Sequence, residues 1–449
     1  MARLFGTDGV RGLANVDITA DLALKIGEAA ARYFGAVRSD GTKARVVIGR
    51  DTRISGEFLE HALAAGLASA GMDVTLLGVV TTPTVAYLTA SQDDIDLGVM
   101  ISASHNPMPD NGIKFFAHGG YKLPDAVEDE IEALIGTEWD RPTGDGVGEI
   151  DEQHEKAKRL YVDHLVKSVN TDLKGLTIVV DAANGAAFEL GPLTLREAGA
   201  EVIVINAEPD GRNINHNAGS THPEGLQKAV VKHKADLGVA YDGDADRCLA
   251  VDAEGNLIDG DKIMGALAVD ARERGKLKGD TLVVTVMSNL GLILAMRDKG
   301  IKTVQTAVGD RYVLEEMRAS NYVLGGEQSG HIIDLDHATT GDGILSSLLV
   351  ARMVKESGRS LADLTAFVER LPQTLINVGG VDRSGAATNE AVAAAVKAGE
   401  AQLGDTGRVL LRPSGTEPLV RVMVEAATQE QADSVAASLA DVVKENLAI

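Results

Sequence analysis

A strand–helix–strand unit occurs three times along the chain, and this repeat limits the fold more than any other sequence feature. Each unit begins with an apolar, β-rich segment, at residues 45–49, 176–180 and 281–286. A polar loop follows, then a helical segment that ends at a glycine, then a second apolar segment. This alternation is typical of parallel βαβ units, with the glycine at the left-handed position after the helix. We therefore expect three related mixed-sheet α/β domains.

The C-terminal part has a different pattern. It predicts an Ala-rich helix at 389–403, two strands at 408–411 and 419–424, and a closing amphipathic helix at 429–446. This order indicates a smaller α+β domain. Shifts in composition then divide the chain into four domains, expected at residues 1–152, 153–254, 255–371 and 372–449.

Composition and charge exclude several classes of protein. The 449 residues are 45% apolar and 24% charged, as in ordinary globular proteins, and the net charge is −23. So acidic a chain is not expected to bind nucleic acid or an anionic membrane. The single cysteine, Cys248, rules out an internal disulfide and a Cys-rich zinc site. No apolar stretch of secretory or membrane-spanning type is present, so we expect a soluble cytoplasmic protein.

A serine-rich loop follows the apolar segment 97–101. It reads Ser-Ala-Ser-His-Asn-Pro from Ser102 onward. Ligands of open α/β sheets bind at the carboxyl ends of strands, so Ser104, beside His105, is a candidate nucleophile. Ser102 is expected to shape the turn by hydrogen bonding to the backbone. The alternative is an ordinary strand exit, and no hydrolase G-x-S-x-G motif surrounds the serine.

Three aspartates follow the apolar segment 237–241 at every second position: Asp242, Asp244 and Asp246. Carboxylates at this spacing can converge on one hard cation, and so few protein ligands favour Mg²⁺. An EF-hand is excluded because Arg247 stands at the sixth position, which requires glycine, and Ala253 at the twelfth. A solvated acidic turn is the remaining alternative.

Two further loops carry clusters of polar residues. The first, Gly-Gly-Glu-Gln-Ser-Gly-His at 325–331, is expected between strands 322–324 and 332–333, where it could hydrogen-bond several hydroxyls. The second, Arg-Pro-Ser-Gly-Thr-Glu-Pro at 412–418, combines a guanidinium, hydroxyls and backbone N–H groups, as a phosphate site does. Plain hairpin turns are the alternative for both loops.

Basic side chains are present in three turn-rich segments near the N-terminus, at 6–12, 50–53 and 111–114. Each segment alone is typical of a surface turn. Together they could neutralise the aspartates and a phosphoryl group. The sequence thus indicates a site that handles a phosphorylated polyol with Mg²⁺.

The four main motifs occur in the order and spacing of the α-D-phosphohexomutase family, and the resemblance covers nearly the whole chain. It implies four domains around a central cleft, with Ser104 as a phosphoserine. A 1,6-bisphosphate of the sugar would form, turn end for end and return its other phosphoryl group to Ser104. Mg²⁺ and this hexosamine bisphosphate are the implied cofactor and intermediate.

The resemblance also implies roles for individual residues. Ser104 and the three aspartates match the Mg²⁺ ligands. Residues that match catalytic positions are Ser104, Lys114, His331, Arg11 and Arg247. Residues that match contacts to the sugar and its non-transferred phosphate are Glu327, Ser329, Arg412, Ser414, Gly415, Thr416 and Arg421.

The start Phe-Gly-Thr-Asp-Gly-Val-Arg-Gly and Gln328 resemble the family members that interconvert glucosamine 6-phosphate and glucosamine 1-phosphate. Specificity for mannose or glucose phosphates is one alternative, and a Mg²⁺-dependent sugar phosphatase that uses Asp242 as nucleophile is another. A sugar-phosphate sensor without turnover is a third. The expected partner is a small sugar phosphate, with no nucleic acid and no membrane, and a homodimer is compatible with the resemblance.

Overall fold

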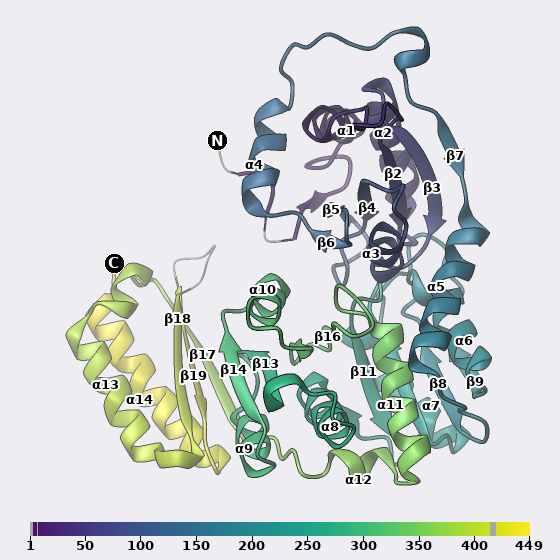
Figure 1. Ribbon diagram of the computed structural model, residues 1–449. Coiled ribbons are helices and arrows are strands. Elements are labelled where there is room, and N and C mark those ends of the chain that lie inside the picture. Colours follow the sequence, from purple (N-terminus) through teal and green to yellow (C-terminus); the bar gives the residue numbers. More distant parts are fainter. Residues whose placement is uncertain (1–2, 7, 414–418) are drawn as a thin grey trace. The chain divides into compact units, whose positions relative to one another are not determined.

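The computed structural model describes residues 3–6, 8–413 and 419–449, and it divides into two compact units (Figure 1). The first unit comprises Met1–Met287 and Ile301–Ala366, and the second comprises Ser288–Gly300 and Phe367–Ile449. No helix among the described residues is both long and apolar enough to cross a membrane.

The first sheet has seven strands in the order β1-β5-β4-β2-β3-β7, with β6 paired to β5. Strand β2 is parallel to β3 and β4, whereas β5 is antiparallel to β4 and β1, so the sheet is mixed. Its strands are β1 (Val10–Leu13), β2 (Arg45–Arg50), β3 (Asp73–Val79), β4 (Leu97–Ile101), β5 (Asp110–Ala117), β6 (Tyr121–Lys122) and β7 (Ile150–Glu152). The accompanying helices are α1 (Ala20–Phe34), α2 (Ile54–Ser69), α3 (Thr82–Ser91) and α4 (Asp125–Leu134).

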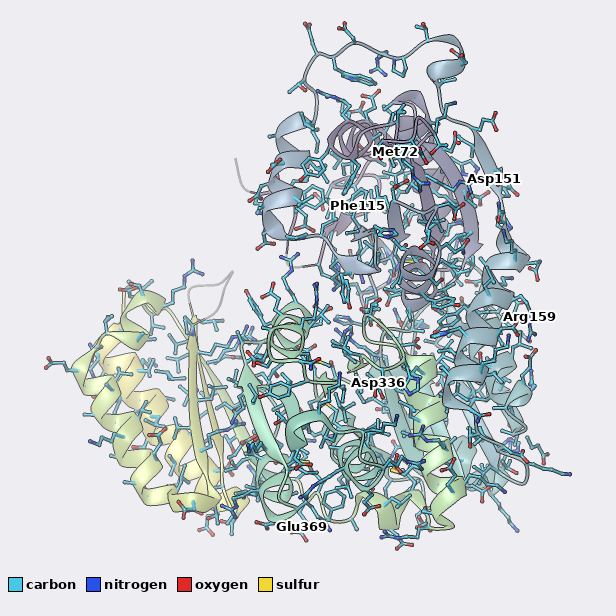
Figure 2. All side chains as sticks on the ribbon, in the orientation of Figure 1. Met72, Phe115, Asp151, Arg159, Asp336 and Glu369 are labelled. Carbon is cyan, nitrogen blue, oxygen red and sulfur yellow. The ribbon has the colours of Figure 1, made fainter. Side chains whose placement is uncertain are left out.

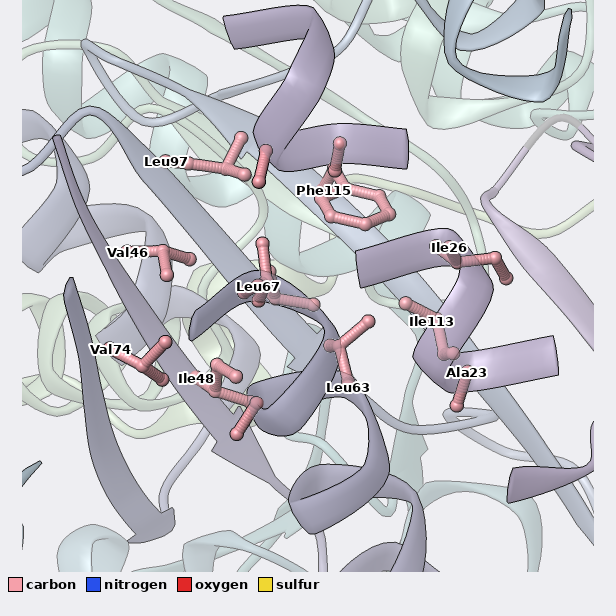
Figure 3. Packing of buried hydrophobic residues seen from close by; sticks show 14 of the residues in the cluster. Ala23, Ile26, Val46, Ile48, Leu63, Leu67, Val74, Leu97, Ile113 and Phe115 are labelled. Atoms are coloured by element: carbon pink, nitrogen blue, oxygen red, sulfur yellow. The ribbon is translucent and has the colours of Figure 1, made fainter. Parts of the chain in front are cut away.

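The core of this region packs α1 and α2 against one face of the sheet (Figure 3). Leu63 and Leu67 of α2 lie in one buried cluster with Val46 and Ile48 of β2. The two helices approach each other closely at Gly66, where a Cβ atom would lie 2.1 Å from the carbonyl oxygen of Leu24. Glycine is therefore required by the packing and not by the helix itself.

The second and third sheets repeat the parallel pairing. The second sheet has the order β12-β11-β10-β8-β9 and the third β14-β13-β15-β16. Strands β8 and β9 are parallel, and so are β13 and β14, which confirms the expected mixed-sheet α/β class. The strands are β8 (Thr177–Asp181), β9 (Glu201–Ile205), β10 (Leu237–Tyr241), β11 (Cys248–Asp252), β12 (Leu257–Ile258), β13 (Thr281–Thr285), β14 (Lys302–Thr306), β15 (Leu324–Gly326) and β16 (Ile332–Asp334).

The remaining helices of the first unit accompany these two sheets. They are α5 (His154–Val169), α6 (Ala187–Glu197), α7 (Glu224–His233), α8 (Gly260–Glu273), α10 (Asp310–Ser320), α11 (Gly343–Ser357) and α12 (Leu361–Thr365). Short 3-10 helices occur in this unit at Gly144–Gly146, Gly219–Thr221 and Lys278–Asp280, and in the second unit at Arg383–Ala387 and Gly404–Thr406.

The polar loop expected at 325–331 is shorter than the sequence suggests. Gly325 and Gly326 belong to β15, where they pair with Ile333 and Ile332 of β16. The expected strand 322–324 is therefore displaced towards the loop. Glycine has low strand propensity, and backbone pairing with a buried apolar strand overrides that preference here.

The second unit is an antiparallel sheet in the order β17-β19-β18 with three helices. Its elements are β17 (Gln373–Gly379), β18 (Arg408–Pro413), β19 (Leu419–Glu425), α9 (Leu290–Asp298), α13 (Glu390–Leu403) and α14 (Gln429–Leu447). Buried Glu425 accepts hydrogen bonds from Asn289 Nδ2 at 3.1 Å and from the backbone N–H of Leu290 at 3.0 Å. These contacts attach the start of α9 to β19, although the chain places α9 between β13 and β14.

Candidate active site

The serine loop that follows β4 has a fixed conformation. Ser102 Oγ donates to Asp51 Oδ2 at 2.7 Å and accepts the Ser104 N–H at 2.9 Å, which is the turn-shaping contact expected of Ser102. Ser104 has φ 51°, a left-handed backbone conformation that residues other than glycine rarely adopt. Its buried Oγ donates to Asp242 Oδ2 at 2.5 Å and lies 3.3 Å from His105 Nδ1.

Arg53 holds this loop from inside the protein. Its fully buried guanidinium pairs with Asp51 at 2.9 Å and donates to the carbonyl oxygens of Ser104 at 3.0 Å and Asn106 at 2.8 Å. Two more carbonyls of the same loop accept from it. From the loop between β9 and α7, Asn215 Nδ2 donates to the Ser104 carbonyl at 2.8 Å.

The expectation that the segment 50–53 neutralises the aspartates is therefore wrong for its arginines. Arg53 is satisfied by Asp51 and by loop carbonyls. Arg50 pairs with Glu60 at 2.9 Å. The sequence does not reveal that Arg53 holds the serine loop, because the loop carbonyls that accept from it are about 50 or more positions away in the chain.

The three aspartates converge as predicted. Asp242, Asp244 and Asp246 follow β10, are buried, and offer carboxylate oxygens that lie within 4.8 Å of one another. Asp244 Oδ1 and Asp246 Oδ1 are buried and have no hydrogen-bond partner among the described residues. Unpaired carboxylate oxygens in a buried position are costly, so the group fits a hard, oxygen-seeking cation.

Lys114 supplies a permanent positive charge beside this group. Its buried ammonium lies 3.0 Å from Asp244 Oδ2 and 3.2 Å from Asp8 Oδ2. Burial lowers the pKa of Lys114, but the charges of Asp244 and Asp8 outweigh burial and raise it overall. Asp244 Oδ2 also accepts from Thr82 Oγ1 at 2.6 Å, which joins the start of α3 to the aspartate loop.

The pKa values of Asp242 and Asp246 are shifted in opposite directions. Burial, followed by the charges of Asp246 and Asp244, raises the pKa of Asp242 well above its usual value. Burial also raises the pKa of Asp246, but His331 and the cations Lys114 and Arg247 overcome it and hold that pKa well below the usual range. A bound cation would lower both pKa values.

His331 lies at the centre of a row of alternating charges. Its Nδ1 is 3.6 Å from Asp246 Oδ2 and its Nε2 is 3.6 Å from Asp310 Oδ2. Burial lowers the pKa of His331, but these two carboxylates raise it overall. Lys122 Nζ donates to Asp310 Oδ2 at 2.5 Å and to Asp8 Oδ1 at 2.5 Å.

Arg11 completes this row through an ion pair with Asp8. The sequence predicted Arg11 and His331 but missed Asp8, Lys122 and Asp310. Lys122 is 114 positions from Asp8 and 188 from Asp310, so no local motif joins them.

Arg247 contacts the aspartates, and His105 contacts the serine. The Arg247 N–H donates to Asp242 Oδ1 at 3.2 Å, and its Nε lies 3.9 Å from Asp246 Oδ1. Burial, together with the charges of Arg247 and Arg11, lowers the pKa of His105 to about 4. The His105 imidazole is therefore neutral near pH 7.

The loop between β15 and β16 is half-buried and does not form a fully exposed polar tip. Glu327 Oε1 accepts the Gly309 N–H at 3.2 Å, and Ser329 Oγ is buried without a hydrogen-bond partner among the described residues. Gln328 Nε2 donates to Asp261 Oδ2 of α8 at 3.0 Å, so this side chain is engaged by the protein. Glu327 and Ser329 can therefore still form hydrogen bonds to a ligand.

The expected phosphate cradle lies in the second unit. Arg412 of β18 and Arg421 of β19 are direct cross-strand partners, and both are exposed. Like charges directly opposite each other are unfavourable in a sheet, and an anion between them would relieve the repulsion. Ser414, Gly415 and Thr416 lie outside the described residues.

Comparison with protein families assigns most of this chain to one group. Models of the phosphoglucomutase/phosphomannomutase family match it in sequence order: α/β/α domain I at residues 2–141, domain II at 159–255, domain III at 259–371 and the C-terminal domain at 375–442. The chain therefore belongs to the phosphoglucomutase/phosphomannomutase family, whose members are isomerases of the phosphohexomutase type.

Curated relatives are similar over their full length. A phosphoglucosamine mutase from Bifidobacterium animalis subsp. lactis is 61% identical, with 100% of both chains covered. A phosphoglucosamine mutase from Nocardioides sp. is 60% identical, also with 100% of both chains covered. Among solved structures, a phosphoglucomutase/phosphomannomutase family protein from Burkholderia thailandensis matches with a TM-score of 0.82 and 25% identity, covering 99% of this chain and 97% of that one.

Proposed function

We propose that this enzyme interconverts glucosamine 6-phosphate and glucosamine 1-phosphate. The curated relatives at about 60% identity, all named phosphoglucosamine mutase, support this choice of sugar. The motif Gly-Glu-Gln-Ser-Gly-His supports it less directly, because Gln328 contacts Asp261 and not an open face of the loop.

One observation supports the mechanism most strongly: Ser104 Oγ lies 2.5 Å from Asp242 Oδ2, within the group of three buried aspartates. A phosphoserine carries nearly two negative charges and cannot lie beside carboxylates without compensation. Mg²⁺ bound by Asp242, Asp244, Asp246 and an oxygen on Ser104 would offset this charge and that of the transferring phosphoryl group.

Two phosphoryl transfers make up this mechanism, and Ser104 Oγ takes up a proton in the first and gives it up in the second. The phosphoryl group leaves Ser104 Oγ and bonds to the C1 oxygen of glucosamine 6-phosphate, whose proton moves to a basic group. The sugar 1,6-bisphosphate turns end for end. Its 6-phosphoryl group then bonds to Ser104 Oγ, the C6 oxygen regains a proton, and glucosamine 1-phosphate leaves.

Several side chains of this chain have proposed roles in these steps. Lys114, Arg11 and Arg247 offset phosphoryl charge, and His331 exchanges a proton with the sugar hydroxyl. Glu327 and Ser329 hold sugar hydroxyls. The non-reacting phosphate is proposed to bind Arg412, Ser414, Gly415, Thr416 and Arg421.

A substrate panel tests the sugar. Glucosamine, glucose and mannose 6-phosphates are each incubated with enzyme, Mg²⁺ and the matching 1,6-bisphosphate, and ³¹P NMR follows the 1-phosphate. We expect glucosamine 6-phosphate to have the highest kcat/KM. A preference for glucose or mannose 6-phosphate would reassign the substrate, and release of inorganic phosphate would indicate a phosphatase.

Paired serine variants test the mechanism. Ser104→Ala should lose activity by several orders of magnitude, and mass spectrometry should locate phosphate on Ser104 of the wild type. Ser102→Ala is the matched control: it loosens the turn but keeps the phosphorylated hydroxyl, so it should retain phosphate on Ser104. Phosphate on Ser102, or near-normal turnover by Ser104→Ala, would overturn the assignment.

We also propose that the domain boundaries lie near residues 152, 254 and 371, and that the enzyme acts in the cytoplasm. A homodimer remains a proposal that sedimentation can test.

A further inference from the structure

A cavity of about 230 Å³ lies in the first unit, apart from the aspartate group. Its walls come from one face of α3, from α5, and from the segment that joins β16 to α11. Figure 2 labels Asp336, an exposed residue of that segment. None of the proposed catalytic residues lines the cavity, so the mutase reaction leaves it without a role.

Aromatic rings form much of the wall. The Tyr87 ring stacks on the His164 ring with centroids 4.2 Å apart and planes 17° apart. Tyr161 lies 6.2 Å from Tyr87, and its hydroxyl donates to Asp342 at 2.8 Å. Aromatic side chains in a cavity wall offer apolar surface, against which planar ligands pack.

The polar groups of the cavity define the charge of a ligand. Among the described residues that line it there is no lysine or arginine, whereas Asp336 and Asp342 both contribute carboxylates. Nδ1 of His337 is buried and has no hydrogen-bond partner in the described part of the chain. Because that nitrogen is buried, a ligand in the cavity meets the carboxylates and not the imidazole nitrogen, and the negative charge disfavours anions.

We infer that this cavity is a second small-molecule site, which takes a neutral or cationic planar heteroaromatic ligand. Its volume exceeds that of a 150 Å³ cavity known to hold benzene, so a two-ring heterocycle fits. An N–H group of the ligand would lie towards the carboxylates, and the ring faces would pack against the aromatic wall.

The walls of the cavity are connected to the aspartate loop. Pro83 lines the cavity, and the adjacent Thr82 bonds Asp244 through both its hydroxyl, at 2.6 Å, and its N–H, at 3.0 Å. On another wall, Asp342 is followed by Gly343, whose N–H donates to the Ala245 carbonyl at 2.9 Å. A ligand that fixes these walls should therefore change the affinity for Mg²⁺, and Mg²⁺ should change the affinity for the ligand by the same factor.

Benzimidazole, a neutral two-ring heterocycle, is a suitable probe. We expect it to bind the full-length enzyme with a Kd of about 1 mM or lower, as seen by ligand-observed NMR and titration. Benzimidazole-5-carboxylate, the anionic analogue, should bind at least tenfold more weakly. Equal binding of the two probes would overturn the charge argument.

Cavity-filling variants locate the binding. Ala90→Trp on α3 and Ala338→Trp on the joining segment place a ring inside the cavity from two different walls, so a folding defect in one leaves the other informative. Ala65→Trp, on an exposed position of α2, is the matched control. We expect tenfold weaker binding in the first two variants and no change in the third.

No binding to the wild type, or equal binding in all variants, would overturn the site. An unchanged Mg²⁺ dependence of turnover at saturating benzimidazole would overturn the coupling to the aspartate loop. The binding measurements need no turnover, so failure of this inference is distinguishable from failure of the proposed function.

Discussion

At the scale of single residues, the site depends on buried charges that hold other groups in place. Ser104 is in a left-handed conformation, and Arg53 and Asn215 donate to its carbonyl. Strained conformations of this kind persist where the surroundings over-determine them. These hydrogen bonds from Arg53 and Asn215, here called the clamp, fix the direction of the Ser104 hydroxyl towards Asp242.

Arg53→Lys should weaken this clamp. A lysine has three donors, whereas Arg53 makes five side-chain hydrogen bonds, so at least two of its oxygen acceptors lose that bond, at about 1–3 kcal/mol for each acceptor left without a partner. Urea unfolding should show this loss, and kcat should fall while KM changes little. Arg50→Lys is the control, since Arg50 pairs with one carboxylate that a lysine can also reach. Equal effects of the two variants would contradict the clamp.

Asp244→Asn should abolish turnover with the fold intact. The change removes one ligand charge and leaves the Lys114 ammonium with the carboxylates of Asp8 at 3.2 Å and Asp246 at 4.0 Å. Mg²⁺ affinity, measured by calorimetry, should fall by at least about 10- to 100-fold. Changing a residue that only supports a metal ligand already has an effect of this size, so the loss of a ligand should have at least as large an effect. Asp252→Asn, on β11 of the same sheet, is the matched buried control and should keep its Mg²⁺ dependence. Full activity of Asp244→Asn, or of wild type treated with EDTA, would exclude the metal site.

At the scale of elements, the sequence predicts the fold well and the site partly. Strands β4 and β10 coincide with the expected segments 97–101 and 237–241, because short apolar runs bounded by turn residues have few other structures. The serine and the aspartates were found because each follows such a strand. Thr82, Asn215 and Asp310 were missed, since their partners are distant in sequence and only the fold brings them together.

Helix packing offers an element-scale prediction. Gly66→Ala should destabilise the first unit by about 1–3 kcal/mol or more, because the new Cβ would meet the Leu24 carbonyl of α1 at 2.1 Å. Gly56→Ala, in the same helix, meets the flexible Arg50 side chain at 3.3 Å and should change stability by less than about 1 kcal/mol. Urea midpoints of both variants compare the two. A neutral Gly66→Ala would contradict the close helix contact.

At the scale of the whole first unit, buried hydrogen bonds join regions that the family comparison assigns to different domains. Asp342 caps α11 and accepts from the Tyr161 hydroxyl of α5 at 2.9 and 2.8 Å. Burial raises the pKa of Asp342 to about 6, although Leu345 N–H and Tyr161 hydrogen bonds oppose this rise. Protonation of Asp342 therefore affects a hydrogen bond that joins two of these domains.

This linkage predicts a pH dependence of stability. The unfolded carboxyl has a pKa of about 3.9, so between about pH 4 and 6 the folded state binds more protons than the unfolded state, and stability falls as pH rises through that window. The loss amounts to about 1.4 kcal/mol per unit of pKa difference.

Asp342→Asn keeps the cap and removes the titration, so its unfolding temperature should decline less than that of the wild type from pH 4.5 to 7. Tyr161→Phe removes an opposing hydrogen bond, which raises the pKa of Asp342 further and should extend the decline to higher pH. Wild-type and Asp342→Asn curves that run parallel across this range would contradict the assignment, because every other titrating group is common to both proteins.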